Sequence, residues 1–280
     1  MLAPTLRDKY ERLQAVIREL RSVAVAFSAG VDSTLVLKIA RDALGAGNVV
    51  AVTGRSASVP AEELTEASKL AERIGVEHQF LDTDEFENPD YLSNPTNRCY
   101  FCKTTLYRHL ERFVSDRGLE AAINGTNSDD LGDYRPGLRA ADEFRVRSPL
   151  AEVGLTKPEV RELSRELGLP TYDKPASPCL SSRVPYGEAI TPEKLRMIEA
   201  AERFLHELGI RECRVRHHDT LARIEVPPEF FDRIAENRAR IDSHFLSLGY
   251  KFVTLDPRGF RSGSLNEVIT LRVNERVAQS

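Results

Sequence analysis

Short apolar runs alternate with amphipathic stretches along the first half of the chain. The apolar runs predict strands at 23–27, 48–53, 77–83 and 120–127. Apolar residues that recur every three or four positions predict helices at 6–20, 34–44, 60–74, 102–117 and 158–168. Strands that alternate with helices in this way indicate an α/β fold with a doubly wound parallel sheet. Such sheets bind ligands at the carboxyl ends of their strands.

The pattern changes after Tyr186-Gly187. It then predicts a helix to about residue 208, strands at 213–219 and 221–226, a helix over 228–248, and a strand at 251–256. This order is typical of a smaller α+β domain. We therefore divide the chain into a first domain, 1–185, and a second domain, 186–280.

The segment between these two patterns, TYDKPASPCLSSRVPYG (171–187), follows neither a helical nor a strand period and is predicted to be a loop. It carries Cys179 between prolines. A thiol there can be a packing atom, a metal ligand, a nucleophile or a source of sulfur.

Composition narrows the setting of this chemistry. The 280 residues carry a net charge of −4, and no apolar run approaches the length of about 20 residues that a membrane span needs. The N-terminus lacks the apolar region of a signal peptide, so we expect a cytoplasmic protein with no membrane partner. Four cysteines are too few for a disulfide framework. The negative charge argues against a nucleic-acid partner.

The strand-loop-helix VAVAF-SAGVDS-TLVLKIA is the most informative stretch. Small residues at Ser28, Ala29 and Gly30 let backbone N–H groups approach an anion, and the following helix directs its N-terminus at the same point. Ser28 and Ser33 can add hydroxyl donors, whereas Asp32 would repel phosphate unless Mg²⁺ lies between them. The alternative is a Ser/Gly turn that only caps a helix.

The loop is neither a Walker A loop nor a GxGxxG loop. It resembles the SGGxDS loop of the PP-loop ATP pyrophosphatase superfamily, with Ala29 at a usual glycine. The resemblance implies ATP and Mg²⁺ as cofactors, with AMP attached to a substrate oxygen and pyrophosphate released. The residues predicted to bind ATP are Ser28, Gly30, Val31, Asp32, Ser33, Thr53 and Gly125, with Asp32 reaching Mg²⁺ through the phosphates.

Cys99 and Cys102 form a C-x-x-C motif at the start of a predicted helix. Such a pair can be a redox dithiol, half of a zinc site, part of an iron–sulfur site, or two packing residues. Cys179 is a third thiol that can complete a 4Fe-4S site with one open iron. Cys213 lies in a predicted strand and is interpreted as a packing residue.

Taken together, the motifs resemble the LarE family over essentially the whole chain. They lie at 28–33, 97–103, 125–137, 148–187, 214–219 and 256–264. The resemblance implies an ATP-dependent sulfur transferase of nickel-pincer nucleotide synthesis, which adenylates the carboxylates of pyridinium-3,5-biscarboxylic acid mononucleotide and converts them to thiocarboxylates. It also implies a homo-oligomer, and a second domain that binds substrate or mediates oligomerisation.

The same resemblance implies two sources of sulfur. In one branch Cys179 attacks as a nucleophile and loses its own sulfur, leaving dehydroalanine. In the other, Cys99, Cys102 and Cys179 hold a 4Fe-4S cluster that delivers sulfide. The presence of all three cysteines favours the cluster branch, and the sacrificial branch stays open.

Cationic residues are the candidates for holding the substrate. Lys174 and Arg183 flank Cys179 in sequence and can lower its pKa or bind phosphate. Arg214 and Arg216 share one face of a predicted strand, and with Arg261 they can hold a 5′-phosphate. Each can instead be an ordinary solvated charge. Five acids have no assigned role: Asp129, Asp130, Asp133, Glu202 and Asp232.

Three other functions compete with this one. A PP-loop tRNA thiolase also combines the loop with cysteines, but it requires a basic groove. An amide-forming PP-loop synthetase of the NAD or GMP kind needs no cysteine trio. A non-enzymatic nucleotide-binding module would tolerate Asp32→Asn and Cys179→Ala.

Overall fold

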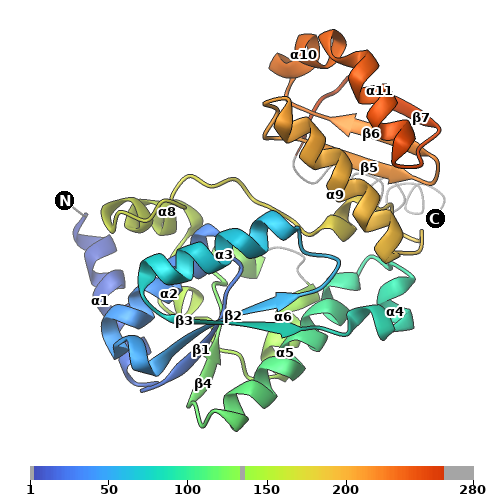
Figure 1. Ribbon diagram of the computed structural model, residues 1–280. Coiled ribbons are helices and arrows are strands. Elements are labelled where there is room, and N and C mark those ends of the chain that lie inside the picture. The colour runs from blue at the N-terminus through green and yellow to red at the C-terminus, as the bar shows by residue number, and fades with distance from the viewer. Residues whose placement is uncertain (1–2, 133–135, 262–280) are drawn as a thin grey trace, which may run out of the picture. The chain divides into compact units, whose positions relative to one another are not determined.

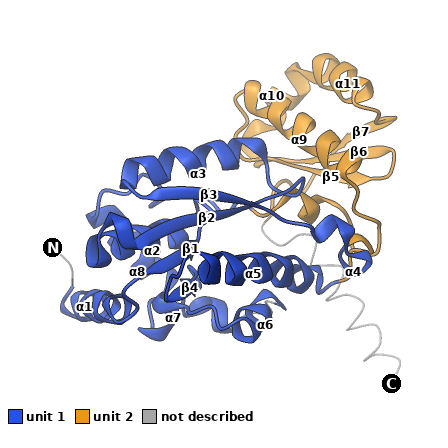
Figure 2. Cartoon of the chain, turned by 60° about the horizontal axis from the view of Figure 1, so that its bottom comes forward, with its two compact units in different colours: residues 1–91, 96–177 blue, residues 92–95, 178–280 orange. Residues whose placement is uncertain are grey.

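The computed structural model describes residues 3–132 and 136–261, which form two compact units. Unit 1 comprises residues 1–91 and 96–177, and unit 2 comprises residues 92–95 and 178–280, less the residues outside the description (Figure 2). The sequence analysis places the domain boundary at 185–186; the division by contacts falls at 177–178, and residues 92–95 belong to unit 2.

Unit 1 is built on a four-stranded sheet in the order β3-β2-β1-β4, with every pair parallel (Figure 1). Its strands are β1 Val23–Ala26, β2 Val49–Arg55, β3 Glu77–Asp82 and β4 Ala121–Ile123. Its α-helices are α1 Pro4–Arg18, α2 Val31–Leu44, α3 Ala61–Ile74, α4 Pro89–Leu92, α5 Arg98–Asp116, α6 Pro136–Glu143, α7 Pro149–Glu152 and α8 Lys157–Glu166. Three short 3₁₀ helices are η1 Ala46–Asn48, η2 Glu85–Glu87 and η3 Asp129–Gly132.

Alternation along the strands sends apolar side chains to both faces of this sheet. Val23, Val25 and Ala51 belong to one core cluster, which also contains buried residues of α1, α2, α3 and α8. Ala24 and Val52 belong to a second cluster with α5 and α6. The sheet is thus covered on both sides, and the predicted doubly wound α/β fold is confirmed.

Unit 2 has a three-stranded sheet in the order β5-β6-β7, with β5 antiparallel and β7 parallel to β6. Its elements are η4 Leu180–Arg183, α9 Pro192–Glu207, β5 Arg214–His218, β6 Leu221–Glu225, η5 Pro228–Phe230, α10 Phe231–Glu236, α11 Arg238–Ser247 and β7 Phe252–Leu255. Val215, Ala222 and Ile224 pack with the helices in one core cluster. The opposite sheet face is therefore left to the alternate residues of β5 and β6.

A short excursion of the chain into unit 2 carries a buried asparagine. Asn94 Nδ2 donates to Val184 O at 3.2 Å and to Pro185 O at 2.7 Å, and Gly187 N–H donates to Asn94 O at 2.9 Å. The side chain is fully buried, with a left-handed φ of 53°. These bonds tie residues 92–95 to the chain that follows Cys179.

No helix within 3–132 and 136–261 has the length and apolar character that crossing a membrane requires.

Candidate functional site

The loop between β1 and α2 is held together by its own two serines. Ser28 N–H donates to Ser33 Oγ at 3.2 Å, and the two hydroxyl oxygens lie 3.1 Å apart. Ala29 has a left-handed φ of 54°, a conformation that glycine adopts more readily, which accounts for the glycine usual at this position. α2 begins after Gly30 with no side chain capping its N-terminus. The N–H groups of its first turn are therefore available to bind an anion, because no N-cap side chain accepts from them.

Thr53 and Gly125 bring the neighbouring strand ends against this loop. Thr53 Oγ1 donates to Phe27 O at 2.7 Å and lies 2.9 Å from His78 Nε2. A Cβ on Gly125 would lie only 2.7 Å from Ser33 N, so the chain after β4 touches the backbone of α2 directly. All seven residues predicted to bind ATP thus lie in or against one loop at the carboxyl edge of the sheet.

Asp32 stands in the first turn of α2, where it meets two partners from distant parts of the chain. Its carboxylate forms an ion pair with Lys157, at the start of α8, and accepts a hydrogen bond from Asn127 Nδ2 at 3.1 Å. Asp129 fixes the same region, because its Oδ2 accepts from Lys157 N–H at 2.8 Å. The sequence analysis missed Lys157, whose partner lies 125 residues away. The loop acid Asp133 lies outside the described residues.

Lys174 also reaches the phosphate loop. Its ammonium donates to Glu63 at 2.8 Å, to Glu66 at 2.7 Å and to Ala29 O at 3.3 Å. The sequence analysis assigned Lys174 to the substrate or the thiol and did not foresee the two carboxylates of α3.

The C-x-x-C cysteines lie in the first turn and a half of α5. Cys99 is exposed and Cys102 is half-buried, and their spacing of three places them on one face of the helix. Thiolates are the ligands that iron–sulfur clusters use, so the pair suits a cluster in kind. Cys179, the third thiol, belongs to unit 2. Across the described ranges, no three His, Cys, Asp or Glu side chains gather closely enough to hold a metal ion.

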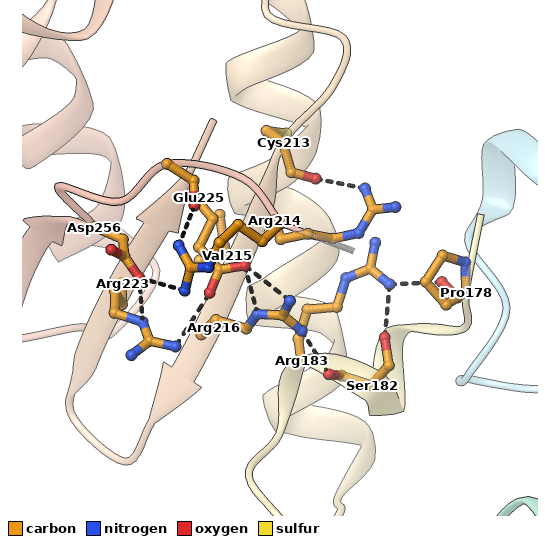
Figure 3. A network of polar contacts seen from close by, with 12 residues as sticks. Pro178, Ser182, Arg183, Cys213, Arg214, Val215, Arg216, Arg223, Glu225 and Asp256 are labelled. Atoms are coloured by element: carbon orange, nitrogen blue, oxygen red, sulfur yellow. Dashed lines mark hydrogen bonds and ion pairs between the residues drawn. The ribbon is translucent and has the colours of Figure 1, made fainter. Parts of the chain in front are cut away.

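In unit 2, Arg183 binds the chain around Cys179. Arg183 Nη1 donates to Cys179 O at 3.1 Å. The same nitrogen donates to Ser182 Oγ at 2.9 Å (Figure 3). Its other nitrogens form two bonds of 2.9 Å with Glu202 of α9. Burial acts to lower the pKa of Arg183, but the charge and hydrogen bonds of Glu202, together with Cys179 and Cys213, raise it overall. The guanidinium is thus a permanent charge beside the cysteine backbone.

Glu202 is a functional candidate to which the sequence analysis gave no role. Its Oε1 also accepts from Val215 N–H at 2.9 Å, which ties α9 to β5. The carboxylate is 8% exposed, and only its position on the buried face of a predicted helix could have singled it out.

A second ion-pair group extends along the polar face of the small sheet (Figure 3). Arg216 bonds Glu225 through two nitrogens at 3.0 and 2.8 Å, and its third nitrogen donates to Ser182 O at 2.8 Å. Arg223 links Glu225 at 3.1 Å to Asp256 at 3.8 Å. Two more arginines belong to this network, Arg214 and Arg261. Its guanidiniums are those of Arg183, Arg214, Arg216, Arg223 and Arg261, and its carboxylates are those of Glu202, Glu225 and Asp256.

Among the described residues, this network gathers five guanidiniums and three carboxylates on one part of unit 2. Burial and the neighbouring Arg183 both lower the pKa of Arg214. Its guanidinium carbon lies 5.2 Å from the centroid of the Phe260 ring. Guanidiniums gathered in this way suit an anion with several oxygens, such as a phosphate. Cys213, by contrast, is fully buried in the core of unit 2, and its interpretation as a packing residue is confirmed.

Comparison with known proteins bears on this site. Residues 7–89, which include the phosphate loop, match the NAD synthase family model. The chain is 48% identical to an uncharacterized protein of Synechocystis, over 95% of this chain and 99% of that one. It is 40% identical to the pyridinium-3,5-bisthiocarboxylic acid mononucleotide synthase of Lactiplantibacillus plantarum, over 95% of this chain and 96% of that enzyme. The chain belongs to this synthase family.

Membership confirms the LarE resemblance and establishes the chain as an ATP-dependent sulfurtransferase with a PP-loop fold. A tRNA-specific 2-thiouridylase of Caulobacter is 31% identical, but over only 55% of this chain and 47% of its own length. The chain therefore resembles the LarE-type synthase over more of its length than it resembles the thiouridylase.

Proposed function

We propose that the protein converts the two carboxylates of pyridinium-3,5-biscarboxylic acid mononucleotide to thiocarboxylates, and so supplies the nickel-pincer cofactor of lactate racemase. The observation that carries the proposal is the 40% identity, over nearly the whole of both chains, to the bisthiocarboxylic acid mononucleotide synthase. The substrate is a small nucleotide, whose phosphate an arginine-rich site can bind. A nucleic acid usually requires an extended basic surface, and the net charge of −4 argues against one.

The first step is adenylation. The N–H groups at the start of α2, with Ser28, Gly30, Val31 and Ser33, hold the phosphates of ATP. A carboxylate oxygen of the substrate attacks the α-phosphorus, the bond from that phosphorus to the bridging oxygen breaks, and pyrophosphate leaves. Mg²⁺, when bound, would balance the charge of the pyrophosphate. Asp32 suits the magnesium side of this loop because a hard carboxylate oxygen is what Mg²⁺ prefers. Lys157, its present partner, is near enough to neutralise it when no nucleotide is bound.

The second step is sulfur transfer. The Cys179 thiolate attacks the acyl carbon, the bond from that carbon to the AMP oxygen breaks, and AMP leaves. Removal of the Cα proton of Cys179 then breaks its Cβ–Sγ bond, so that the thiocarboxylate departs with the sulfur and dehydroalanine remains. The guanidiniums of Arg183, Arg214, Arg216 and Arg261 hold the 5′-phosphate of the substrate during both steps.

The alternative sulfur source is the predicted 4Fe-4S cluster. Cys99, Cys102 and Cys179 would be its ligands, and when bound it would supply sulfide so that Cys179 survives the reaction. Support for it rests on the three thiols and on the shared helix face of Cys99 and Cys102. Five peptide steps, which span at most about 18 Å, join Cys179 to Lys174.

The two sulfur sources differ in what happens to the protein. Purified anaerobically, the protein is to be analysed for iron and sulfide, and its intact mass recorded after turnover. Loss of one hydrogen sulfide from the chain supports the sacrificial branch and excludes catalytic use of a cluster. An unchanged chain with bound iron and many turnovers does the opposite.

The adenylation step has its own test. The protein is incubated with MgATP and the biscarboxylate nucleotide, and pyrophosphate is measured. Release with this substrate supports the proposal. Release with tRNA and none with the nucleotide would favour a thiolase, the class to which the Caulobacter relative belongs. Light scattering in the same buffer tests the further predictions of a homo-oligomer, and fractionation of the source cells tests a cytoplasmic location.

A further inference from the structure

Lys174 lies five residues before Cys179 and contacts the phosphate loop of unit 1. All three N–H groups of its ammonium have an acceptor: Glu63, Glu66 and the carbonyl of Ala29. Its side chain is only 16% exposed. One of these acceptors, Ala29 O, belongs to the left-handed residue of the phosphate loop. The lysine therefore joins the segment that precedes Cys179 to the loop that receives ATP.

The backbone around Lys174 is fastened to the same unit. Arg161 of α8 donates to Tyr172 O at 2.8 Å and to Lys174 O at 3.0 Å. Lys174 N–H donates to Thr171 O at 3.0 Å, closing a turn. Residues 171–174 therefore form an anchored turn, and only residues 175–178 lie between it and Cys179. Any shift of Lys174 must be taken up within these four residues.

The charges around Lys174 favour a change when a nucleotide binds. One ammonium faces two carboxylates, and Glu66 is the weaker partner because its side chain is 42% exposed and its ion pair is screened by water. A polyphosphate at the loop brings further negative charge to the neighbourhood of Ala29. The ammonium then has a stronger acceptor on the side of Ala29, away from Glu66.

We propose that Lys174 is a positioning residue that couples nucleotide binding to the segment carrying Cys179. With the loop filled, the ammonium leaves Glu66 for a phosphate oxygen, the turn of residues 171–174 shifts as its bonds from Arg161 adjust, and the path of residues 175–178 changes. The accessibility of Cys179 then depends on whether a nucleotide is bound. This proposal rests on the proposed function, since it requires that the loop bind ATP.

The test measures how fast iodoacetamide alkylates Cys179, by peptide mass spectrometry, with and without a non-hydrolysable ATP analogue and Mg²⁺. In the unaltered protein we expect the analogue to slow alkylation by about fivefold or more, within the usual range for coupled sites. In Lys174→Gln the effect should fall below about twofold although the analogue still binds. Lys174→Arg should retain it. Lys69→Gln, an exposed lysine on α3, is the matched control and should behave as the unaltered protein.

Calorimetric titration of the analogue separates the possible failures. If Lys174→Gln binds the analogue and keeps the full alkylation effect, the nucleotide shields Cys179 directly and the coupling proposal is overturned. If the unaltered protein does not bind the analogue at all, the proposed function itself fails.

Glu66→Gln tests the same proposal through the affinity for the ATP analogue, which should rise. It removes a competitor for the ammonium, so the analogue should bind about two- to fivefold more tightly, the worth of one partly exposed ion pair. If Lys174 and Glu66 served only to hold the fold together, the same change would leave binding unaltered or weaken it, and either result would count against the proposal.

Discussion

The contact between Gly125 and α2 gives the sharpest test of how the phosphate loop works. In Gly125→Ala the new Cβ would lie 2.7 Å from Ser33 N and 2.9 Å from the carbonyl carbon of Asp32. Ordinary van der Waals contact begins near 3.4 Å, so the first turn of α2 must retreat by about 0.7 Å, the difference between the two distances. The atoms that move are the N–H groups proposed to hold phosphate.

This displacement sets the expected magnitude. A misplacement approaching 1 Å near a reacting group costs up to about 100-fold in rate, so we expect kcat/KM for ATP to fall by about 10- to 100-fold. Crowding of the backbone should also lower the free energy of unfolding by about 1–3 kcal/mol. Pyrophosphate release at varied ATP concentration measures the first quantity, and urea unfolding measures the second.

Gly132→Ala is the matched control, because it lies seven residues further along the same connection and a Cβ there would meet nothing within 4 Å. It should leave both quantities within experimental error of the unaltered protein. A Gly125→Ala protein with kcat/KM for ATP within twofold of the original would refute the reasoning. Equal losses in the two variants would show that the connection is sensitive for some reason other than the contact with α2.

Three further changes probe the two units. Glu202→Gln leaves the buried guanidinium of Arg183 without its counter-charge and should cost about 3 kcal/mol or more in urea unfolding, and a loss below about 1 kcal/mol would contradict a buried pair. Burial lowers the pKa of His217 from 6.5 to about 4, so as pH falls from 6.5 to 4 the unfolded chain takes up a proton that the folded chain refuses. Up to about 3 kcal/mol of stability should be lost over that interval, and unfolding curves of His217→Phe should lack this part of the slope; an unchanged slope in that variant would contradict the assignment to His217. Thr53→Val removes the hydroxyl that donates to Phe27 O and should lower the free energy of unfolding by about 1–3 kcal/mol, whereas an unchanged value would mean that water replaces the hydroxyl.

The sequence predicted most of the strands well because their signals are local, but β4 ends at Ile123, four residues before the predicted end. Apolar runs bounded by turns marked β1, β2 and β3 to within about two residues at each end, in line with the usual error of such boundaries. The helix predicted over 228–248 is broken at Asn237 into α10 and α11, because that residue takes a non-helical conformation between them. α5 begins at Arg98, four residues before the predicted start, so that both C-x-x-C cysteines are helical.

The partners of the site residues could not be predicted, since they depend on contacts between distant segments. Nothing near Asp32 in the sequence points to Lys157, and nothing near Lys174 points to Glu63. Arg183 was singled out for its place beside Cys179, yet its partner Glu202 is one of many acids on helices. Charge at a position can be read from a sequence, but the neutralising group is known only once the chain has folded.

The excursion of residues 92–95 has a consequence for how the protein is made. Asn94 leaves the ribosome 90 residues before Val184, the carbonyl that its side chain will bind. At about 5–20 residues per second, this interval is on the order of 5–20 seconds. During that time the carbonyls of Val184 and Pro185 are not yet available, so the second unit is completed only after its own residues have been made. A gene fragment that starts at residue 178 would lack Asn94 and leave these carbonyls without its side-chain amide.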